Sequence, residues 1–213
     1  MKIIILAGGP EERQPDLSLF AGEKAVWAGV DRGVFYLLKK GIIPGCVFGD
    51  FDSVNRSERE WMASFNLPSF EYDSEKDKTD LELALDWALE QKPEQILLMG
   101  VTGGRLDHEL ANIQLLLHGL EAGINIEIWD RQNKIALSAP GPHIIQQEPE
   151  FSYVSFLPFN GPVTGLTLKG FKYPLQDQYL PMGSTLCISN ELVNKSGTYS
   201  FSGGILMLVK SHD

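Results

Sequence analysis

Aspartates in three short motifs are the residues of this chain best suited to chemistry. The motifs are Gly49-Asp50-Phe51-Asp52-Ser53, Asp77-Lys78-Thr79-Asp80 and Gly103-Gly104-Arg105-Leu106-Asp107-His108. Each falls where an apolar strand is expected to end or a helix to begin, which would gather the carboxylates at one edge of a sheet. Open α/β folds bind their ligands at such an edge. The simplest use of the cluster is to hold a divalent metal ion.

Asp50 and Asp52 follow an expected strand from Cys46 to Gly49. Because side chains alternate along a strand, a spacing of two points both carboxylates to one side. Two hard oxygen donors suit Mg²⁺, which usually takes one or two carboxylates together with water and phosphate oxygens. The alternative is an Asx turn followed by Ser53 as a helix N-cap.

Asp80 is expected in the first turn of a helix. Thr79 precedes Glu82 by three residues, the spacing of a capping box, and an acid in a first turn is favoured by the helix dipole in any protein. The preceding Asp77, Lys78 and Thr79 add a carboxylate, an ammonium and a hydroxyl. Such a loop could hold metal, phosphate and a substrate hydroxyl together.

Glycine-rich turns offer backbone N–H groups to an anion. Residues 100–105 leave a strand and open a helix, where N–H groups can face a phosphate. Arg105 can fork onto phosphate oxygens, whereas His108 can equally be an ordinary helix histidine. The turns that contain Gly9 and Asp31-Arg32 could approach a nucleotide closely or be simple tight turns.

Apolar runs and helical patterns alternate up to residue 130, which predicts an α/β domain with a mostly parallel sheet over residues 1–130. Strands are expected at Lys2 to Leu6, Ala25 to Val30, Cys46 to Gly49, Ser69 to Tyr72, Gln95 to Val101 and Asn125 to Trp129. Helices are expected at Gly33 to Lys40, Ser57 to Asn66, Asp80 to Gln91 and Leu106 to Glu121. In the last helix, Leu106, Leu110, Ile113 and Leu117 should form the inward stripe.

Short apolar runs separated by turns follow, without a helical pattern. They predict an all-β, sandwich-like domain over residues 131–213. The runs are Lys134 to Leu137, Tyr153 to Leu157, Thr185 to Ile188 and Ile205 to Val209.

Composition excludes several classes of function. A net charge of −10 argues against binding to nucleic acid or to an anionic membrane surface, and a phosphate-bearing substrate would need a cation between it and the aspartates. No stretch resembles a signal peptide or a membrane span. Cys46 and Cys187 lack the spacing of a zinc site and are expected as buried thiols. We therefore expect a cytoplasmic protein.

Taken in order, the three motifs closely resemble those of the bacterial thiamine pyrophosphokinase (thiamine diphosphokinase) family. No single motif is decisive, but the ordered set is highly specific. The resemblance extends to Val30-Asp31-Arg32-Gly33 and to Ser189-Asn190, so it spans nearly the whole chain. It implies an α/β domain, a β domain that contributes to thiamine binding, and a homodimer with its sites at the interface.

The resemblance also implies a reaction and residue roles. The family transfers a diphosphate unit from ATP to the hydroxyl of thiamine and releases AMP. Asp50, Asp52 and Asp80 would hold Mg²⁺, and either Asp50 or Asp80 could accept the hydroxyl proton. The nucleotide side would be bound by residues of the strand-end loops and the glycine loop: Gly9, Asp31, Arg32, Lys78, Thr79, Gly104, Arg105, Asp107 and His108. Tyr173, at a position where animal members carry Trp, would stack on thiamine, with Ser189 and Asn190 as hydrogen-bond partners of its pyrimidine ring.

Two other functions remain open. Leu6-Ala7-Gly8-Gly9 is similar to the opening of nucleotide-sugar pyrophosphorylases, although Pro10-Glu11-Glu12 replaces their basic continuation. A non-catalytic sensor that binds thiamine or a nucleotide without turnover would carry the same motifs.

Overall fold

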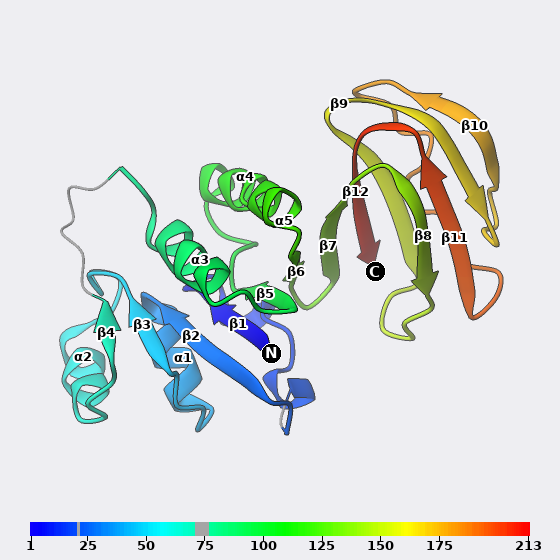
Figure 1. Ribbon diagram of the computed structural model, residues 1–213. Coiled ribbons are helices and arrows are strands. Elements are labelled where there is room, and N and C mark those ends of the chain that lie inside the picture. The colour runs from blue at the N-terminus through cyan, green and yellow to red at the C-terminus, as the bar shows by residue number, and fades with distance from the viewer. Residues whose placement is uncertain (21, 71–76) are drawn as a thin grey trace. The chain divides into compact units, whose positions relative to one another are not determined.

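The computed structural model describes residues 1–20, 22–70 and 77–213 (Figure 1). The chain is a sheet-rich α/β protein in which strands pair both in parallel and in antiparallel fashion. It divides into two compact units, Met1–Arg131 and Gln132–Asp213. No helix of the described residues is long and apolar enough to cross a membrane.

The first unit is built on a parallel sheet with the strand order β4-β3-β2-β1-β5-β6. The strands are β1 (Lys2–Leu6), β2 (Ala25–Val30), β3 (Cys46–Phe48), β4 (Ser69–Phe70), β5 (Gln95–Met99) and β6 (Asn125–Trp129). The predicted strand from Ser69 to Tyr72 extends past the described residues. Residues 3–6 of β1 are all fully buried, as expected for a central strand that is covered on both faces.

Helices cover both faces of this sheet. They are α1 (Arg32–Lys39), α2 (Arg56–Ala63), α3 (Asp80–Glu90), α4 (Leu106–Gln114) and α5 (Leu116–Ala122), with short 3₁₀ turns at Glu11–Arg13 and Leu17–Phe20. Both α1 and α3 pack on β1 and β2, and Figure 1 shows them on opposite sides of the sheet. Because the strand order reverses between β1 and β5, the loops at their carboxyl ends diverge and leave room for a ligand.

The prediction of one continuous helix from Leu106 to Glu121 was wrong. Two helices, α4 and α5, meet at Leu115, and the expected inward residues Leu106 and Leu110 are 67% and 55% exposed. Asn112 is buried instead, and its amide donates a hydrogen bond to the carbonyl of Val101 (2.9 Å). The buried Asn112 thus satisfies a buried backbone carbonyl that the periodicity of the leucines does not reveal.

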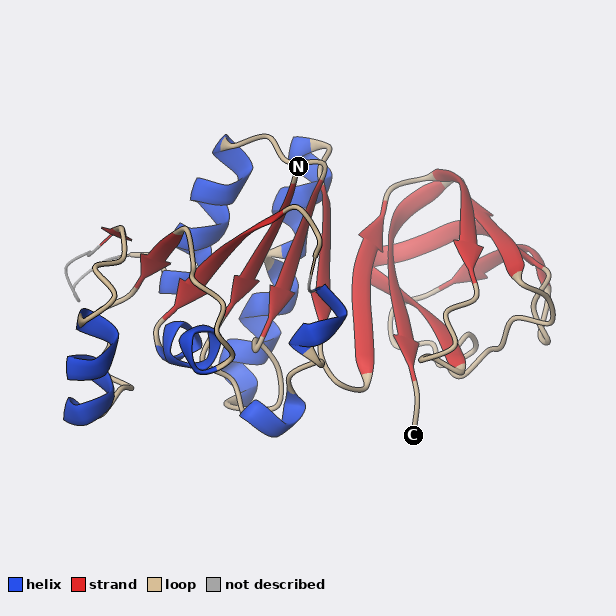
Figure 2. Ribbon diagram, turned by 90° about the horizontal axis from the view of Figure 1, so that it is seen from below, coloured by secondary structure: helices blue, strands red, loops and turns tan. Residues whose placement is uncertain are grey.

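The second unit contains no helix, and all of its residues are described. Its strands are β7 (Asn133–Ser138), β8 (Gly141–Gln146), β9 (Tyr153–Lys169), β10 (Leu175–Leu180), β11 (Ser196–Phe201) and β12 (Gly203–Ser211), shown in red in Figure 2. All pair antiparallel, and β9 is long enough to pair with β12 first and with β10 and β11 further along. The core between them includes Phe156, Val163 and Leu206, which are fully buried.

One predicted strand of this unit is absent. Thr185–Ile188 forms turns, in which Leu186 and Ile188 are exposed and only Cys187 is buried. The Cys187 carbonyl accepts a hydrogen bond from the N–H of Phe156 (3.0 Å), so one contact anchors an otherwise irregular loop. Cys46 and Cys187 are both free and buried, as predicted, and burial raises their thiol pKa values to about 12 and about 11.

Candidate functional site

A pocket of ≈ 730 Å³ lies at the carboxyl ends of the central strands of the first unit. Loops after β1, β2, β3 and β5 contribute to it, together with the first residues of α3 and α4. The structure brings nine of the predicted site residues to this one pocket: Gly9, Asp31, Asp50, Asp52, Thr79, Asp80, Gly104, Arg105 and His108. Residues far apart in sequence meet here because parallel strands end at the same edge.

Asp50 and Asp52 lie in a turn, so the expectation of an extended strand end was wrong. The backbone N–H of Asp52 donates to Oδ1 of Asp50 (3.0 Å), which is an Asx turn, and Phe51 has a positive φ of 59°. The helix that follows is capped by Asn55, not by Ser53. Both carboxylates nevertheless line the same pocket, because the turn directs them there in place of the alternation along a strand.

Gly49 allows the Asp50–Asp52 turn to lie close to Asp31, at the end of β2. Its φ is +119°, and a Cβ built on it would come within 2.0 Å of Asp31 Oδ1. Any other residue would have to displace the Asp31 carboxylate and adopt a strained backbone at this φ. The close approach brings the carboxylate of Asp31 to the same pocket as those of Asp50 and Asp52.

Thr79 and Asp80 begin α3. The Thr79 hydroxyl accepts a hydrogen bond from the N–H of Glu82 (3.2 Å), as the predicted cap requires. This bond orients the first turn of α3 and places Asp80 at the pocket. Lys78, by contrast, is not among the pocket residues, because its ammonium binds Asp86 (2.6 Å) and Glu82 (3.4 Å) on the same helix.

Arg32 also points elsewhere. Its guanidinium makes a bidentate pair with Glu58, with N–O distances of 2.8 and 3.0 Å, and one of the same nitrogens donates to the Ser53 carbonyl (3.0 Å). Neither Arg32 nor Asp107 lines the pocket. In this structure their charges are engaged by neighbouring side chains.

The glycine loop between β5 and α4 is closely packed. Gly9 donates to the Gly100 carbonyl (2.8 Å), and a Cβ on Gly9 would come within 2.5 Å of that oxygen. The N–H of Gly103 donates to the carboxylate of Glu109 (2.9 Å). A carboxylate of the chain itself thus stands where an anionic ligand could bind, as expected for N–H groups at a helix N-terminus.

Among the pocket residues that were not predicted as site residues, three have polar side chains: Ser53, Thr102 and Asn112. The Thr102 hydroxyl donates to the carboxylate of Asp130 (2.8 Å), and the Asn112 amide donates to the Val101 carbonyl. The spacing of seven places Asn112 on the same helix face as Arg105 and His108, so the sequence indicated its position although it was not included in the predicted site.

Arg105 and Asp107 form an exposed ion pair, with N–O distances of 2.6 and 3.1 Å. The hydrogen bond from Arg105, helped by the backbone N–H of His108, lowers the pKa of Asp107 to about 2. The pair is formed above the ordinary pKa of an aspartate and is lost as the pH falls through about 2.

We expect Arg105→Gln to raise the pKa of Asp107 toward its ordinary value of 3.8, because the largest cause of the lowering is removed. The His108 N–H remains and keeps the pKa slightly low. An NMR titration of the carboxyl carbon measures this pKa, with Arg56→Gln as the control. An Asp107 pKa that stays near 2 in Arg105→Gln contradicts the assignment.

In the second unit, Asn190 fixes the position of Tyr173. The buried Asn190 amide accepts from the Tyr173 N–H (3.0 Å) and donates to the Tyr173 carbonyl (2.8 Å). The Tyr173 ring is 57% exposed, and the ammonium of Lys172 lies 5.7 Å from its centroid. Ser189 is exposed and has a positive φ of 55°. The structure thus presents an exposed aromatic side chain on a backbone held by two hydrogen bonds.

Among the described residues, no group of three or more His, Cys, Asp or Glu side chains is arranged to hold a metal ion by itself. The pocket still offers the hard oxygen donors of Asp50, Asp52 and Asp80. Mg²⁺ commonly takes only one or two carboxylates and completes its shell with water and phosphate oxygens. This donor set therefore fits Mg²⁺ bound together with a phosphate ligand.

Two family models match the chain. Residues 18–128 match "Thiamin pyrophosphokinase, catalytic domain", and residues 142–206 match "Thiamin pyrophosphokinase, vitamin B1 binding domain". The chain is 49% identical over 214 residues to thiamine pyrophosphokinase from Bacillus subtilis (strain 168), and the match covers 100% of both chains.

Solved structures of thiamine pyrophosphokinases are also similar to this chain. The crystal structure of thiamine pyrophosphokinase from Bacillus subtilis has a TM-score of 0.96 at 47% identity and covers 100% of both chains. Thiamin pyrophosphokinase from Geobacillus thermodenitrificans has a TM-score of 0.93 at 47% identity, covering 100% of this chain and 98% of that one. The enzyme from Candida albicans, at 17% identity and a TM-score of 0.80, covers 99% of this chain and 90% of that one and shares the fold.

Proposed function

Because this chain belongs to the thiamine pyrophosphokinase family, and is thus a kinase-class transferase, we propose that it transfers the diphosphate unit of ATP to thiamine. The products are thiamine diphosphate and AMP. The observation that carries this proposal is the single pocket that gathers Asp50, Asp52 and Asp80 beside two glycine turns. Carboxylates and glycine turns together suit a nucleotide whose phosphates are bound through a cation.

Asp50, Asp52 and Asp80 are the residues proposed to hold Mg²⁺. When bound, the ion offsets the charge that develops on the phosphate oxygens. The turn at Asp50 and the first turn of α3 both bring these carboxylates to the one pocket. The N–H of Gly103 already donates to the carboxylate of Glu109 on α4, so a phosphate that binds this N–H would have to displace that carboxylate.

The remaining pocket residues are proposed to bind and orient ATP. Gly9, Asp31 and Gly104 bring backbone close to the nucleotide, and Arg105 and His108 supply groups that can bind its phosphates. Lys78, Arg32 and Asp107 can take part only after they leave Asp86, Glu58 and Arg105 respectively.

The transfer step balances without any further reactant. The thiamine hydroxyl oxygen attacks the β-phosphorus of ATP in line, and the bond from that phosphorus to the α,β-bridging oxygen breaks. The bridging oxygen leaves with AMP, and the hydroxyl proton passes to a carboxylate. Asp50 and Asp80 are both candidates for this base, since each lines the pocket.

Thiamine is cationic and aromatic, and we assign its binding to the second unit. That unit is proposed to be a sandwich-like all-β domain, and it contains the residues that match the vitamin B1 binding domain. Tyr173 would stack on the acceptor, while Ser189 and Asn190 would bind its pyrimidine ring. Asn190 already orients Tyr173, so its contribution includes positioning this ring.

We further propose that the enzyme acts as a homodimer in the cytoplasm. Its buried free thiols are compatible with a reducing compartment. Sedimentation of the purified protein measures the oligomeric state directly.

Product analysis tests the proposed reaction. The purified protein with ATP, Mg²⁺ and thiamine is expected to form AMP and thiamine diphosphate in equal amounts, and no AMP when thiamine is omitted. Release of pyrophosphate in a nucleotide-sugar assay would instead support a nucleotidyltransferase. Binding of thiamine without any product would indicate a sensor.

A further inference from the structure

The turn that carries Asp50 and Asp52 has few bonds of its own. Within it, the Asp52 N–H donates to Asp50 Oδ1, and the Val54 N–H donates to the Phe51 carbonyl (3.2 Å). Phe51 adopts a left-handed backbone, which costs a non-glycine residue of the order of 1 kcal/mol and persists only where surrounding contacts enforce it. Contacts from outside the turn must therefore hold its shape.

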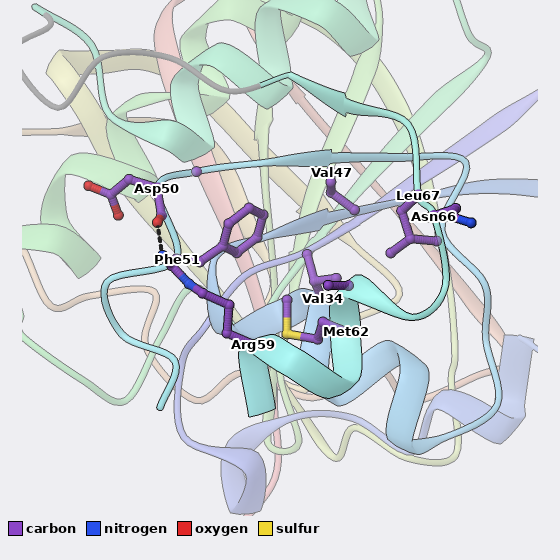
Figure 3. A pocket seen from close by; sticks show the side chains of 10 residues that line it. Val34, Val47, Asp50, Phe51, Arg59, Met62, Asn66 and Leu67 are labelled. Atoms are coloured by element: carbon purple, nitrogen blue, oxygen red, sulfur yellow. Dashed lines mark hydrogen bonds between the residues drawn. The ribbon is translucent and has the colours of Figure 1, made fainter. Parts of the chain in front are cut away.

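Arg59 supplies one of these contacts. It lies on α2, and its guanidinium donates a hydrogen bond to the backbone carbonyl of Asp50 (Figure 3). Arg59 does not line the pocket that contains the three aspartates. It lines an adjoining pocket of ≈ 390 Å³, which shares Asp50 with the first pocket and is otherwise formed mainly by apolar residues of α1, β3, α2 and the chain next to them.

Arg32 supplies the second contact, at the far end of the same turn. It donates to the Ser53 carbonyl (3.0 Å) while its bidentate pair with Glu58 fixes the guanidinium in place. Glu58 also closes the capping box of α2 by accepting from the Asn55 N–H (3.1 Å). One carboxylate thus ties Arg32 on α1 to the start of the helix that carries Arg59.

We propose that Arg59 and Arg32 are positioning residues that clamp the Asp50–Ser53 turn from its two ends and aim the carboxylate of Asp52 into the pocket. The inference rests on the proposed function, in which Asp52 holds the metal ion. Arg32 thereby supports the turn through Ser53, whereas the sequence predicted that it contacts the nucleotide. Neither arginine touches substrate in this role; each acts through a backbone carbonyl of the turn.

The test compares Arg59→Met with Arg56→Met. Arg56 lies on the same helix, but among the described residues it is paired only with Glu60 and its side chain is 93% exposed, so it is a matched control. We expect Arg59→Met to weaken Mn²⁺ binding about tenfold, the lower end of what one hydrogen bond from a charged group contributes. The electron paramagnetic resonance signal of free Mn²⁺ measures this affinity without any turnover.

Two further measurements separate positioning from a general effect on folding. Arg59→Met should lower kcat and leave the Michaelis constant for thiamine unchanged, with a thermal unfolding midpoint close to that of Arg56→Met. Arg59→Lys, which retains a charged donor, should recover part of the Mn²⁺ affinity, and it serves as the test if Arg59→Met does not fold.

The outcomes distinguish this inference from the proposed function. If Asp52→Asn weakens Mn²⁺ binding but Arg59→Met binds the ion as tightly as Arg56→Met, the clamp is refuted and the metal role stands. If Asp52→Asn also binds Mn²⁺ like the unaltered protein, the metal role itself fails, and the clamp fails with it. Weakened binding in both variants, with Arg56→Met unaffected, supports the clamp.

Discussion

Asp52→Asn is expected to reduce kcat roughly 10³-fold, because it removes a negative charge worth about 4 kcal/mol to a metal-assisted transition state. Asp52 is exposed, so the fold should tolerate the change. Steady-state kinetics over a range of Mg²⁺ concentrations measures the loss, and thermal unfolding checks the structure.

Asp16→Asn is the matched control for this variant. Asp16 belongs to the same unit and is exposed, and its Oδ1 accepts from the Ser18 N–H (3.0 Å) in a turn like that of Asp50. It lies outside the pocket that contains Asp52. Asp16→Asn should keep full activity, whereas near-normal turnover of Asp52→Asn at saturating Mg²⁺ would refute the metal role.

Tyr173→Ala is expected to raise the Michaelis constant for thiamine about 30-fold, which corresponds to about 2 kcal/mol of lost stacking on a cationic ring. The Michaelis constant for ATP should change little, because Tyr173 belongs to the second unit and the proposed nucleotide residues belong to the first. Varying each substrate at a saturating level of the other measures both constants.

Tyr179→Ala provides the comparison for Tyr173→Ala. Tyr179 lies on β10 and is 55% exposed, close to the 57% of Tyr173, so both substitutions remove a similar exposed ring. Only Tyr173→Ala should affect thiamine. Equal effects on the two substrates, or no effect, exclude Tyr173 as the stacking residue.

Much of the α/β unit could be predicted from hydrophobic pattern alone. The strands β1, β2 and β6 begin and end at the predicted residues, because a buried parallel strand is a short apolar run bounded by polar turns. The start of α3 was also predictable, since Thr79 caps the N–H of Glu82 through local chemistry. Both signals lie within a few residues of sequence.

Features that depend on distant contacts could not be predicted. The leucine stripe of α4 indicated the wrong buried face: Leu106 and Leu110 are exposed, and Asn112 is buried with its amide bound to the Val101 carbonyl across the loop. Likewise, Thr185–Ile188 has the composition of a strand, but its backbone forms turns and its carbonyl at Cys187 binds the Phe156 N–H. Neither partner can be identified from the local pattern.

The same limit applies to the candidate site. The motifs correctly indicated that Asp50, Asp52 and Asp80 would meet at one edge of the sheet. They could not indicate that Arg32, Lys78 and Asp107 would be paired with Glu58, Asp86 and Arg105. The Arg32–Glu58 pair joins α1 to α2 and depends on how these helices pack, whereas Lys78 and Arg105 bind carboxylates close to them in sequence.

ATP labelled with ³²P at the β-phosphorus tests the central claim most directly, because it follows the phosphorus that is attacked. Incubation with thiamine and Mg²⁺ is expected to place the label in thiamine diphosphate and to leave AMP unlabelled. Label recovered in ADP, with thiamine monophosphate as the other product, would show transfer of the γ-phosphoryl group alone and would contradict the proposed reaction.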